Sequence, residues 1–333
     1  MNTLPSPIII AGPCAAESRE QVLTAARLLS EQAGAAPIIF RAGAWKPRTS
    51  PRTFQGVGAE ALTWLAEARL LYHFPVATEV ATPEHVRLAL AAGIDYLWLG
   101  ARTSASPIAV QAIADTLSAS KQKPLAVLVK NPVNPDPDLW LGNLQRIASA
   151  DVPVIAVHRG CSHRPCWSMA HRVRLARPDI PMLLDPSHLT GEATLIPEAV
   201  QKISLLALDG AMIEVHPCPS DALSDAPQQL TPDAFCSLLP DLQRPADPNA
   251  QLNWYRAEID ELDDSLWDTL LRRLHVCEAI GTWKQEHHMT PLQPERFEQI
   301  LHARLEWGRQ HGISPDAIET ILSAIHSESL KRQ

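Results

Sequence analysis

Short phrases of chemically reactive residues follow apolar runs at several points along the chain. Each run is rich in Val, Ile, Leu and Ala, as in a buried strand, and each phrase begins where its run ends. The phrases are GPCAAES at 12–18, FRAGAWKPRTSP at 40–51, GARTS at 100–104, LVKN at 128–131, VHRG at 157–160, LLDPSHLTG at 183–191 and MIEVHP at 212–217. Parallel strands with reactive side chains at their carboxyl ends are how an α/β barrel builds an active site. The pattern therefore predicts a catalytic site at that end of a barrel.

Four of these residues are potential metal ligands. Cys14, His188 and Glu214 follow three different apolar runs, and Asp225 lies in a later loop. A thiolate, an imidazole and two carboxylates form a plausible ligand set for a first-row divalent metal. The alternative is that the four residues are unrelated, because a cysteine beside Gly-Pro is usually structural. Their shared position at the ends of strands keeps both interpretations open.

Basic residues at the same ends of strands point to anionic substrates. Arg and Lys bind phosphates and carboxylates through charge-assisted hydrogen bonds. A surface ion pair would explain one such residue, but several unpaired positive charges at one barrel mouth repel one another until an anion binds. Two phosphorylated substrates would account for the size of the set. It comprises Arg41, Lys46, Arg48, Arg102, Lys130 and Arg159.

The order of apolar runs and helical segments predicts a (β/α)8 TIM barrel. About eight β/α pairs in some 240 residues are the usual content of that fold. A doubly wound open sheet is the alternative, but no G-x-G-x-x-G phrase follows the first strand. Strands are expected at about 7–11, 37–42, 75–80, 95–99, 124–130, 153–158, 181–185 and 210–215. Helices are expected near 18–33, 56–71, 83–92, 107–120, 137–149, 166–176, 192–206 and 231–239.

The pattern changes after residue 240, and the change predicts a second domain. Residues 241–252 are rich in Pro, Asp and Asn without any period, so they are expected to link a barrel domain at 1–240 to a helical domain at 253–333. A domain this small buries a core more easily as a dimer.

Three helices are expected in the helical domain. The first is long and amphipathic, because apolar residues recur every three or four positions from Ile259 to Leu274. A break at 290–294 precedes a second helix near 295–310. Ser314, with Pro at the next position, is expected to cap a third helix that runs almost to the last residue.

Composition excludes several classes of protein. The chain of 333 residues is 46% apolar, which suits a globular core, and its net charge of −8 offers no basic field for nucleic acid. Its apolar stretches fall short of the roughly 20 residues that span a bilayer, and the N-terminus has no features of a signal peptide. Six cysteines without framework spacing suggest reduced thiols, so a cytoplasmic location is expected.

The phrases of the barrel also resemble a known family. GPCAAES, KPRTSP, GAR, DPSH, EVHP and the ALSDAPQQL loop at 222–230 are similar, in order, to the 3-deoxy-D-arabino-heptulosonate 7-phosphate (DAHP) synthases of the KDO8P-synthase-like type. The resemblance covers about residues 5–240. It implies condensation of phosphoenolpyruvate with erythrose 4-phosphate, the first step of the shikimate pathway, with a divalent metal. Mn²⁺ is the first choice of metal, and Co²⁺, Fe²⁺ and Zn²⁺ are alternatives.

The resemblance implies a role for each matched residue. The metal polarises the aldehyde of erythrose 4-phosphate, carbon 3 of phosphoenolpyruvate attacks it, and Lys46 or a metal-bound water handles protons. The implied metal ligands are Cys14, His188, Glu214 and Asp225. The implied phosphoenolpyruvate contacts are Lys46, Arg102, Lys130 and Arg159, and those of the erythrose phosphate are Arg48 and Thr49.

Some phrases depart from the family pattern. The family often has Asn and Gln after GAR, a KRG phrase and a Glu-Arg-Gly phrase, where this chain has Thr103–Ser106, Lys130-Asn131-Pro132 and His158-Arg159-Gly160. A KDO8P synthase, which uses arabinose 5-phosphate, is the close alternative. It typically has a KANRSS-like phrase, so KPRTSP favours the four-carbon sugar.

The helical domain resembles the all-helical chorismate mutases over about 252–333. The matching order is R-x-x-I-D-x-L-D-x-x-L from Arg256, then Arg273, I-G-x-x-K ending at Lys284, and a terminal S-x-x-x-Q. The resemblance implies rearrangement of chorismate to prephenate by conformational restriction and electrostatic stabilisation of the ether oxygen. The implied catalytic residues are Arg256, Arg273, Lys284 and Gln333, and Arg296 and Ser329 complete the set that binds substrate.

The same resemblance implies a homodimer, or a larger assembly, in which Arg256 reaches the partner's site. The family usually has acids where Phe297 and Gln293 stand here. A rival interpretation is therefore a regulatory domain that binds ligand without useful turnover, and a further rival is a KDO8P synthase with a helical dimerisation domain. In the bifunctional interpretation, the helical domain is also expected to sense prephenate and to inhibit the barrel.

Two smaller patterns have simpler interpretations. Cys161, His163, Cys166 and Cys218 could form a zinc cluster, but their spacing is not that of a finger, and free thiols near the barrel mouth are the expected state. His287 and His288 are expected to be solvated residues at a helix end.

Overall fold

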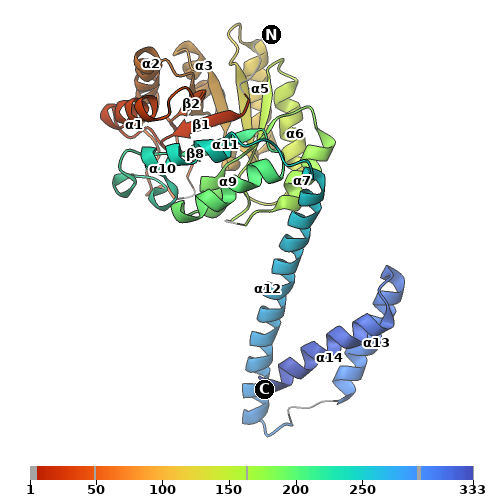
Figure 1. The fold of residues 1–333 in the computed structure, drawn as a ribbon. Helices are drawn as coiled ribbons and strands as arrows, with labels where there is room; N and C mark the ends of the chain where they lie inside the picture. The colour runs from red at the N-terminus through yellow and green to blue at the C-terminus, as the bar shows by residue number, and fades with distance from the viewer. Residues whose placement is uncertain (1–5, 49, 163, 291–293, 333) are drawn as a thin grey trace. The chain divides into compact units, whose positions relative to one another are not determined.

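The computed structural model describes residues 6–48, 50–162, 164–290 and 294–332, and it forms two compact units, Met1–Glu258 and Ile259–Gln333. In the first unit, eight parallel strands close into a barrel in the order of the chain (Figure 1). The predicted (β/α)8 barrel is confirmed. The strands are β1 Ile8–Gly12, β2 Ile38–Arg41, β3 Val76–Glu79, β4 Tyr96–Leu99, β5 Ala126–Lys130, β6 Val154–His158, β7 Met182–Leu184 and β8 Gly210–Glu214.

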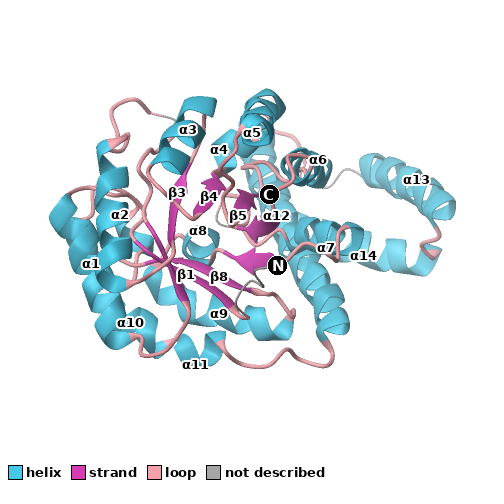
Figure 2. Ribbon diagram, turned by 90° about the horizontal axis from the view of Figure 1, so that it is seen from above, coloured by secondary structure: helices cyan, strands magenta, loops and turns pink. Residues whose placement is uncertain are grey.

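Helices surround the strands, as the view from above shows (Figure 2). The main ones are α1 Arg19–Gln32, α2 Glu60–Tyr72, α3 Pro83–Ala91, α5 Pro107–Ala119, α6 Pro137–Ala148, α7 Trp167–Ala176, α9 Ile196–Leu205 and α10 Pro232–Ser237. Short helices that the sequence did not predict are α4 Ala101–Ser104, α8 Pro186–Thr190, α11 Leu239–Leu242, η1 Ala193–Leu195, η2 Pro219–Asp221 and η3 Ala226–Gln228.

Local sequence explains where several of these helices begin. Thr82, Ser106 and Asp136 each accept a hydrogen bond from a backbone N–H of the first turn, and a proline follows each of them. A proline fits the first helical position because its missing N–H would have no intrahelical partner there. This short signal ends each preceding loop at a fixed residue.

The strands carry two sets of side chains, one on each side of the barrel wall. Every residue of β1 and β5 is buried, as expected of strands that are covered on both sides. One set, which includes Ile9 and Leu97, packs with the surrounding helices. The alternating set, which includes Ile10 and Trp98, consists of strand residues alone and fills the interior. A filled interior leaves the ends of the strands as the place for a site.

The first turns of α12 (Ala250–Glu286) pack on the barrel. Trp254 is 3% exposed and donates from its indole to Leu206 O at 3.0 Å. Its ring stacks on His171 of α7 at a centroid distance of 5.1 Å and meets Trp167 edge-on at 6.1 Å. The N-terminal turns of this helix, up to Glu258, therefore belong to the same compact unit as the barrel.

The second unit consists of the rest of α12, α13 (Pro294–His311) and α14 (Pro315–Lys331), and α13 and α14 lie side by side (Figure 1). Ser314 caps α14 by accepting from Ala317 N, with Pro315 at the first helical position, as predicted. Gly312, where the chain turns between the two helices, has a φ of +76°, which glycine adopts without steric cost. Among the helices of the described ranges, none combines the length and apolarity needed to cross a bilayer.

Gly210, the first residue of β8, is expected to be essential for closing the barrel. It lies opposite Ile8 with a φ of +148°, and a Cβ placed there would be 1.9 Å from Ile8 O. Gly210→Ala should therefore lower the free energy of unfolding by about 1–3 kcal/mol. Urea denaturation followed by circular dichroism measures this. Gly142→Ala is the control, because a Cβ there meets only the mobile end of Arg146, and equal stability of the two variants would contradict the argument.

Candidate active sites

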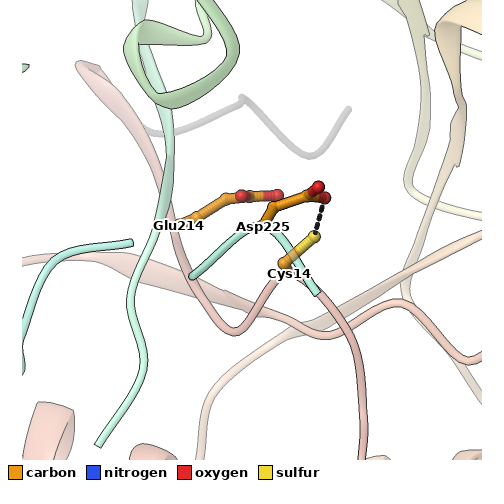
Figure 3. Close-up of side chains that lie close together, drawn as sticks. All are labelled: Cys14, Glu214 and Asp225. Carbon is orange, nitrogen blue, oxygen red and sulfur yellow. Dashed lines mark hydrogen bonds between the residues drawn. The ribbon is translucent and has the colours of Figure 1, made fainter. Parts of the chain in front are cut away.

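The carboxyl end of the barrel brings a thiol and two carboxylates together. The ligand atoms of Cys14, Glu214 and Asp225 all lie within 4.8 Å of one another (Figure 3). Cys14 lies just beyond β1, Glu214 ends β8, and Asp225 comes from the loop after it. The Cys14 thiol donates to Asp225 Oδ2 at 2.9 Å. Three of the four predicted metal ligands therefore share one small region.

His188, the fourth predicted ligand, lies beside this group. Its Nδ1 is 2.9 Å from Asp185 Oδ2, and its Nε2 is 3.8 Å from Glu214 Oε1. A carboxylate on Nδ1 favours the tautomer that leaves the Nε2 lone pair available, which is the usual arrangement for a histidine that binds a metal. The structure therefore brings His188 to the edge of the donor cluster and orients it through Asp185.

The charged residues at this end continue the inward-facing set of the barrel. Side chains alternate along a strand, so Arg41 shares the side of Ile39, Lys130 that of Leu128, and Glu214 that of Met212, and these apolar residues form the interior cluster. The last inward position of several strands is thus charged. The interior changes from apolar to ionic where the barrel opens.

The sequence predicted unpaired cations at the barrel mouth, and this is wrong, because at least four of the six form ion pairs. A buried cation that lacks a counter-charge loses its hydration without compensation, so burial at the strand ends is accompanied by pairing. The ion pairs are Arg41–Glu214 at 3.1 Å, Lys46–Glu79 at 3.8 Å, Arg48–Asp225 at 3.0 Å and Lys130–Asp185 at 2.5 Å. Anion binding therefore cannot be inferred from uncompensated charge alone.

Arg41 takes a position that differs from the one expected of a substrate contact. Its side chain is fully buried, donates to Glu214 and to Cys14 O at 3.3 Å, and lies 4.6 Å from the centroid of the Trp98 ring. It does not line the cavity at the barrel mouth. Arg41 is the last inward residue of β2, so its side chain lies below the cavity, where its hydrogen bonds hold Cys14 and Glu214 in place.

A cavity opens at the same end of the barrel. Five of the six predicted cations line it, together with two of the predicted metal ligands. Its lining residues are Lys46, Pro47, Arg48, Glu79, Trp98, Gly100, Ala101, Arg102, Lys130, Arg159, His188 and Asp225. A space with this many cationic groups suits a ligand with several negative charges.

Lys46 connects the cavity to the donor cluster. Its ammonium donates to Cys14 Sγ at 3.0 Å and lies 3.8 Å from Glu79 Oε2. Burial alone would lower the pKa of Lys46, but the nearby carboxylates of Glu79, Glu214 and Asp225 raise it above its usual value. The group therefore stays protonated at neutral pH and can donate a proton but not accept one.

The thiol and its carboxylate neighbour have opposite pKa shifts. Burial, together with the carboxylates of Glu214 and Asp225, raises the pKa of the Cys14 thiol above its usual range, and Lys46 only partly opposes this. Burial would also raise the pKa of Asp225, but Lys46 and Arg48 hold it below its usual value. Without a further positive charge, Cys14 is thus a neutral thiol that donates to an ionised Asp225.

Asn131, at one of the departures from the family pattern, supports Arg159. Its Oδ1 accepts from the backbone N of Arg159 at 2.7 Å, and its Nδ2 donates to Gly160 O at 3.0 Å. At the end of β6, buried His158 has its Nε2 2.5 Å from Pro165 O and its ring 5.1 Å from that of Trp167. A carbonyl accepts only, so Nε2 of His158 carries the proton.

Sequence reasoning missed four residues that hold the site. Glu79 and Asp185 pair with Lys46 and Lys130. Gln228 donates to Glu214 Oε2 at 2.7 Å, and Gln229 accepts from Cys14 N at 3.0 Å. The signal for the two acids was available, because Glu79 ends a strand and Asp185 follows one. The glutamines carry no such signal, since only the path of the loop brings them to the ligands.

The helical unit has a cavity of its own. Arg273, Lys284, Arg296 and Ser329, which the sequence assigned to a second site, all line it, and Lys284 is 7% exposed. The remaining lining residues are Val276, Cys277, Ile280, Ile300, Leu330, Phe297 and His326. Cationic groups above an apolar wall suit a compact carbocycle that carries carboxylates.

Other predicted residues lie elsewhere. Arg256 is exposed in the first unit and does not line the helical cavity. Thr49, Gln333 and Gln293 fall outside the described residues, as does His163 of the alternative zinc cluster. Within the part of the chain that the structure describes, only Cys14, Glu214 and Asp225 form a group that could hold a metal, so the zinc alternative gains no support.

Fold and sites together define an α/β barrel with a thiol–carboxylate cluster at the carboxyl ends of its strands, followed by a helical domain with a cation-lined cavity. Comparison with known proteins identifies the family. A family model described as "DAHP synthetase I family" matches residues 5–244, and one described as "Chorismate mutase type II" matches residues 255–333. The chain therefore belongs to the DAHP synthetase I family and carries a C-terminal chorismate mutase type II domain.

Relatives of both parts are found. The chain is 32% identical over 246 residues to the phospho-2-dehydro-3-deoxyheptonate aldolase of Thermotoga maritima, covering 72% of this chain and 70% of the relative. It is 30% identical over 102 residues to the 4-amino-4-deoxychorismate mutase of Streptomyces pristinaespiralis, covering 31% of this chain and 78% of the relative. The crystal structure of the DAHP synthase of Thermotoga maritima has a TM-score of 0.61 at 28% identity and covers 71% of this chain and 68% of that chain.

His158 is expected to make the stability of the barrel depend on pH. Burial lowers its pKa to about 4, against roughly 6.5 in an unfolded chain. The unfolded state therefore binds more protons between these values, so a stabilisation of about 3 kcal/mol is complete above pH 6.5 and is lost as the pH falls towards 4. His158→Phe should lose less stability than the wild type between pH 7 and pH 4.5 in urea titrations. His302→Phe, exposed on α13, is the control, and identical pH dependence in all three proteins would exclude His158 as the cause.

Proposed function

We propose that the barrel condenses phosphoenolpyruvate with erythrose 4-phosphate and one water, which adds at carbon 2 of phosphoenolpyruvate, to give DAHP and phosphate. The observation that carries this proposal is the cavity in which Lys46, Arg102, Lys130 and Arg159 adjoin a thiol–carboxylate cluster. The four cations suit the phosphate and carboxylate of phosphoenolpyruvate. Arg48, on the same cavity, is assigned to the phosphate of the sugar. Pro47 and Arg48 belong to the KPRTSP phrase, which differs from the KANRSS-like phrase typical of KDO8P synthases. This difference favours the four-carbon sugar over arabinose 5-phosphate as the substrate.

The donor cluster fits a first-row divalent cation. Cys14, Glu214 and Asp225 offer one sulfur and two carboxylate oxygens that lie within 4.8 Å of one another. His188 Nε2 lies 3.8 Å from Glu214 Oε1, next to this group. Mixed sulfur, nitrogen and oxygen donors suit Mn²⁺, Fe²⁺, Co²⁺ or Zn²⁺. Such an ion would polarise the sugar aldehyde as a Lewis acid, and its charge would favour the Cys14 thiolate with release of a proton.

The residues of this chain would then hold and protonate the reactants. Lys130 and Arg159 fix phosphoenolpyruvate, and Asn131 keeps the backbone of Arg159 in place. Lys46 remains an ammonium beside Cys14 and Glu79, so it is suited to donate a proton to the aldehyde oxygen as the new carbon–carbon bond forms. Negative charge that develops there is stabilised by a group that is already oriented.

Metal dependence through Cys14 is testable directly. Cys14→Ala should lower the rate of phosphoenolpyruvate consumption with erythrose 4-phosphate at least about 100-fold, since losing a ligand should cost no less than losing its supporting groups. A chelator should inactivate the wild type, and added Mn²⁺ should restore it. Cys236→Ala, half-buried on α10, is the matched control. Full activity of chelator-treated Cys14→Ala would refute the metal site, and preference for arabinose 5-phosphate would refute the choice of sugar.

We further propose that the helical domain converts chorismate to prephenate. Arg273 and Arg296 are assigned to the two carboxylates, and Lys284, buried in the cavity, to the ether oxygen whose bond breaks. The rearrangement needs no nucleophile, because a compact conformer and stabilisation of the ether oxygen lower its barrier.

A homodimer through this domain is part of the proposal. Leu262, Leu266 and Trp267 on α12 are 67%, 63% and 65% exposed, and Val276 on the same helix is 59% exposed. A run of exposed large apolar residues on one helix marks an interaction surface. A second copy of this helix supplies a matching apolar surface, as a two-fold interface requires.

Each mutase site is expected to contain Arg256 of the partner protomer. Arg256 and Arg273 lie about five helical turns apart on α12, roughly 25 Å along the axis, so one small substrate cannot contact both within one straight helix. Inactive Arg256→Ala and inactive Lys284→Ala should recover activity when they are mixed in equal amounts under subunit exchange. About half of the dimers are then heterodimers, and one of the two sites in each is intact, so up to about a quarter of the wild-type activity is expected. Absence of recovery after exchange has been demonstrated by native mass spectrometry would contradict sharing.

Feedback by prephenate is the remaining element of the proposal. A dianion bound by Arg273 and Arg296 would inhibit the barrel if it favoured one of two states of the chain, and couplings of this kind are typically about 5–150-fold. Arg273→Gln in the full chain should therefore lose mutase activity and prephenate inhibition together while keeping the basal synthase rate. Arg309→Gln, an exposed residue paired with Glu306, should keep both. Unchanged inhibition in Arg273→Gln would show that prephenate acts elsewhere.

A further inference from the structure

The cavity of the helical domain contains an imidazole that the proposed function does not use. His326 on α14 packs against Phe297 on α13, with ring centroids 4.3 Å apart and planes inclined by 31°. Both rings line the cavity together with Arg273 and Lys284. His326 is half-buried, so one face of its ring is fixed by Phe297 while its edge remains at the cavity wall.

The serine hydroxyl of the cavity is already engaged. Ser329 accepts a hydrogen bond from Arg273 Nη1 and donates one to Ile325 O at 2.7 Å. Its single hydrogen is thereby committed within α14. His326, by contrast, makes no hydrogen bond to any described residue. Its neighbour Phe297 carries no polar atom at all, although it stands where an acid would be expected.

Resting on the proposed mutase reaction, the chemistry of the substrate indicates what His326 would bind. Chorismate carries two carboxylates, an ether oxygen and one ring hydroxyl. The arginines and Lys284 match the anionic groups and the ether oxygen, which leaves the hydroxyl. A hydroxyl both donates and accepts, and a neutral imidazole offers one nitrogen of each kind. We propose that His326 binds the ring hydroxyl of chorismate and makes this domain selective for substrates that carry it.

Two variants separate the hydrogen bond from the ring contact. His326→Phe keeps an aromatic ring against Phe297 but has no polar atom, whereas His326→Gln keeps a donor and an acceptor without the ring. Each is assayed in the full chain with chorismate and with the chorismate analogue that lacks the ring hydroxyl. His326→Phe should lower kcat/KM for chorismate about three- to tenfold, as expected for one neutral hydrogen bond, and leave kcat/KM for the analogue unchanged. His326→Gln should retain most of the preference for chorismate.

Further arms distinguish this inference from the proposed function. His311→Phe is the control, because His311 also stacks on an aromatic ring, that of Trp307, but does not line the cavity. Equal losses with both substrates in His326→Phe would show that the residue only supports the fold and would overturn the inference while the mutase function stands. If the wild type does not turn over chorismate, the proposed reaction fails. The role of His326 is then tested by calorimetric measurement of the affinity for prephenate, which retains the hydroxyl. Equal affinities of wild type and His326→Phe, or no binding, would then overturn the inference.

Discussion

The pairing of β8 with β1 is the constraint on which the barrel site depends. It closes the barrel and places Gly12 opposite Glu214, so the chain that leaves β1 passes directly beside the end of β8. Cys14 and Glu214, two hundred residues apart in the sequence, become neighbours for this reason alone. The loop after β8 then returns to the same place, where Val215 bridges to Leu230 and Gln229 holds the Cys14 backbone. Without closure, the thiol and the carboxylates would be on opposite edges of an open sheet.

A second consequence of closure is that charges of both signs are buried together. The inward positions of the strands end in residues such as Arg41 and Glu214, both fully buried. Each such group is tolerable only because an opposite charge stands against it, and removal of one partner from a buried pair costs about 3–5 kcal/mol. The ion pairs therefore fix the positions of the charged side chains in the site and also reduce the positive charge that is available to a ligand. Any anion that entered the cavity would compete with carboxylates such as Glu79 and Asp185 for the same cations.

The helical domain solves a different problem, because three helices enclose little volume. Its cavity has an apolar wall and cationic groups, and much of the apolar surface of α12 stays exposed, Leu262 and Trp267 among it. The composition of the cavity is not that expected from the resemblance alone. Phe297 replaces an acid, and His326 from the neighbouring helix stands against it. The imidazole beside Phe297 thus comes from α14, whereas Phe297 itself lies on α13.

The amino-acid sequence by itself determined the strands, the main helices and the order of the barrel, since buried parallel strands and capped helices are written in local patterns such as Thr82-Pro83. It also located most residues of the barrel cavity, because residues at the ends of parallel strands must converge, and through a family resemblance it located the cationic residues of the helical cavity. Only the tertiary structure decided how these residues are paired. Arg41 lies behind Cys14 and Glu214, Lys46 contacts both Cys14 and Glu79, and His326 packs against Phe297. No local pattern encodes these contacts between distant segments, because they arise from the closure of the barrel and the packing of helices.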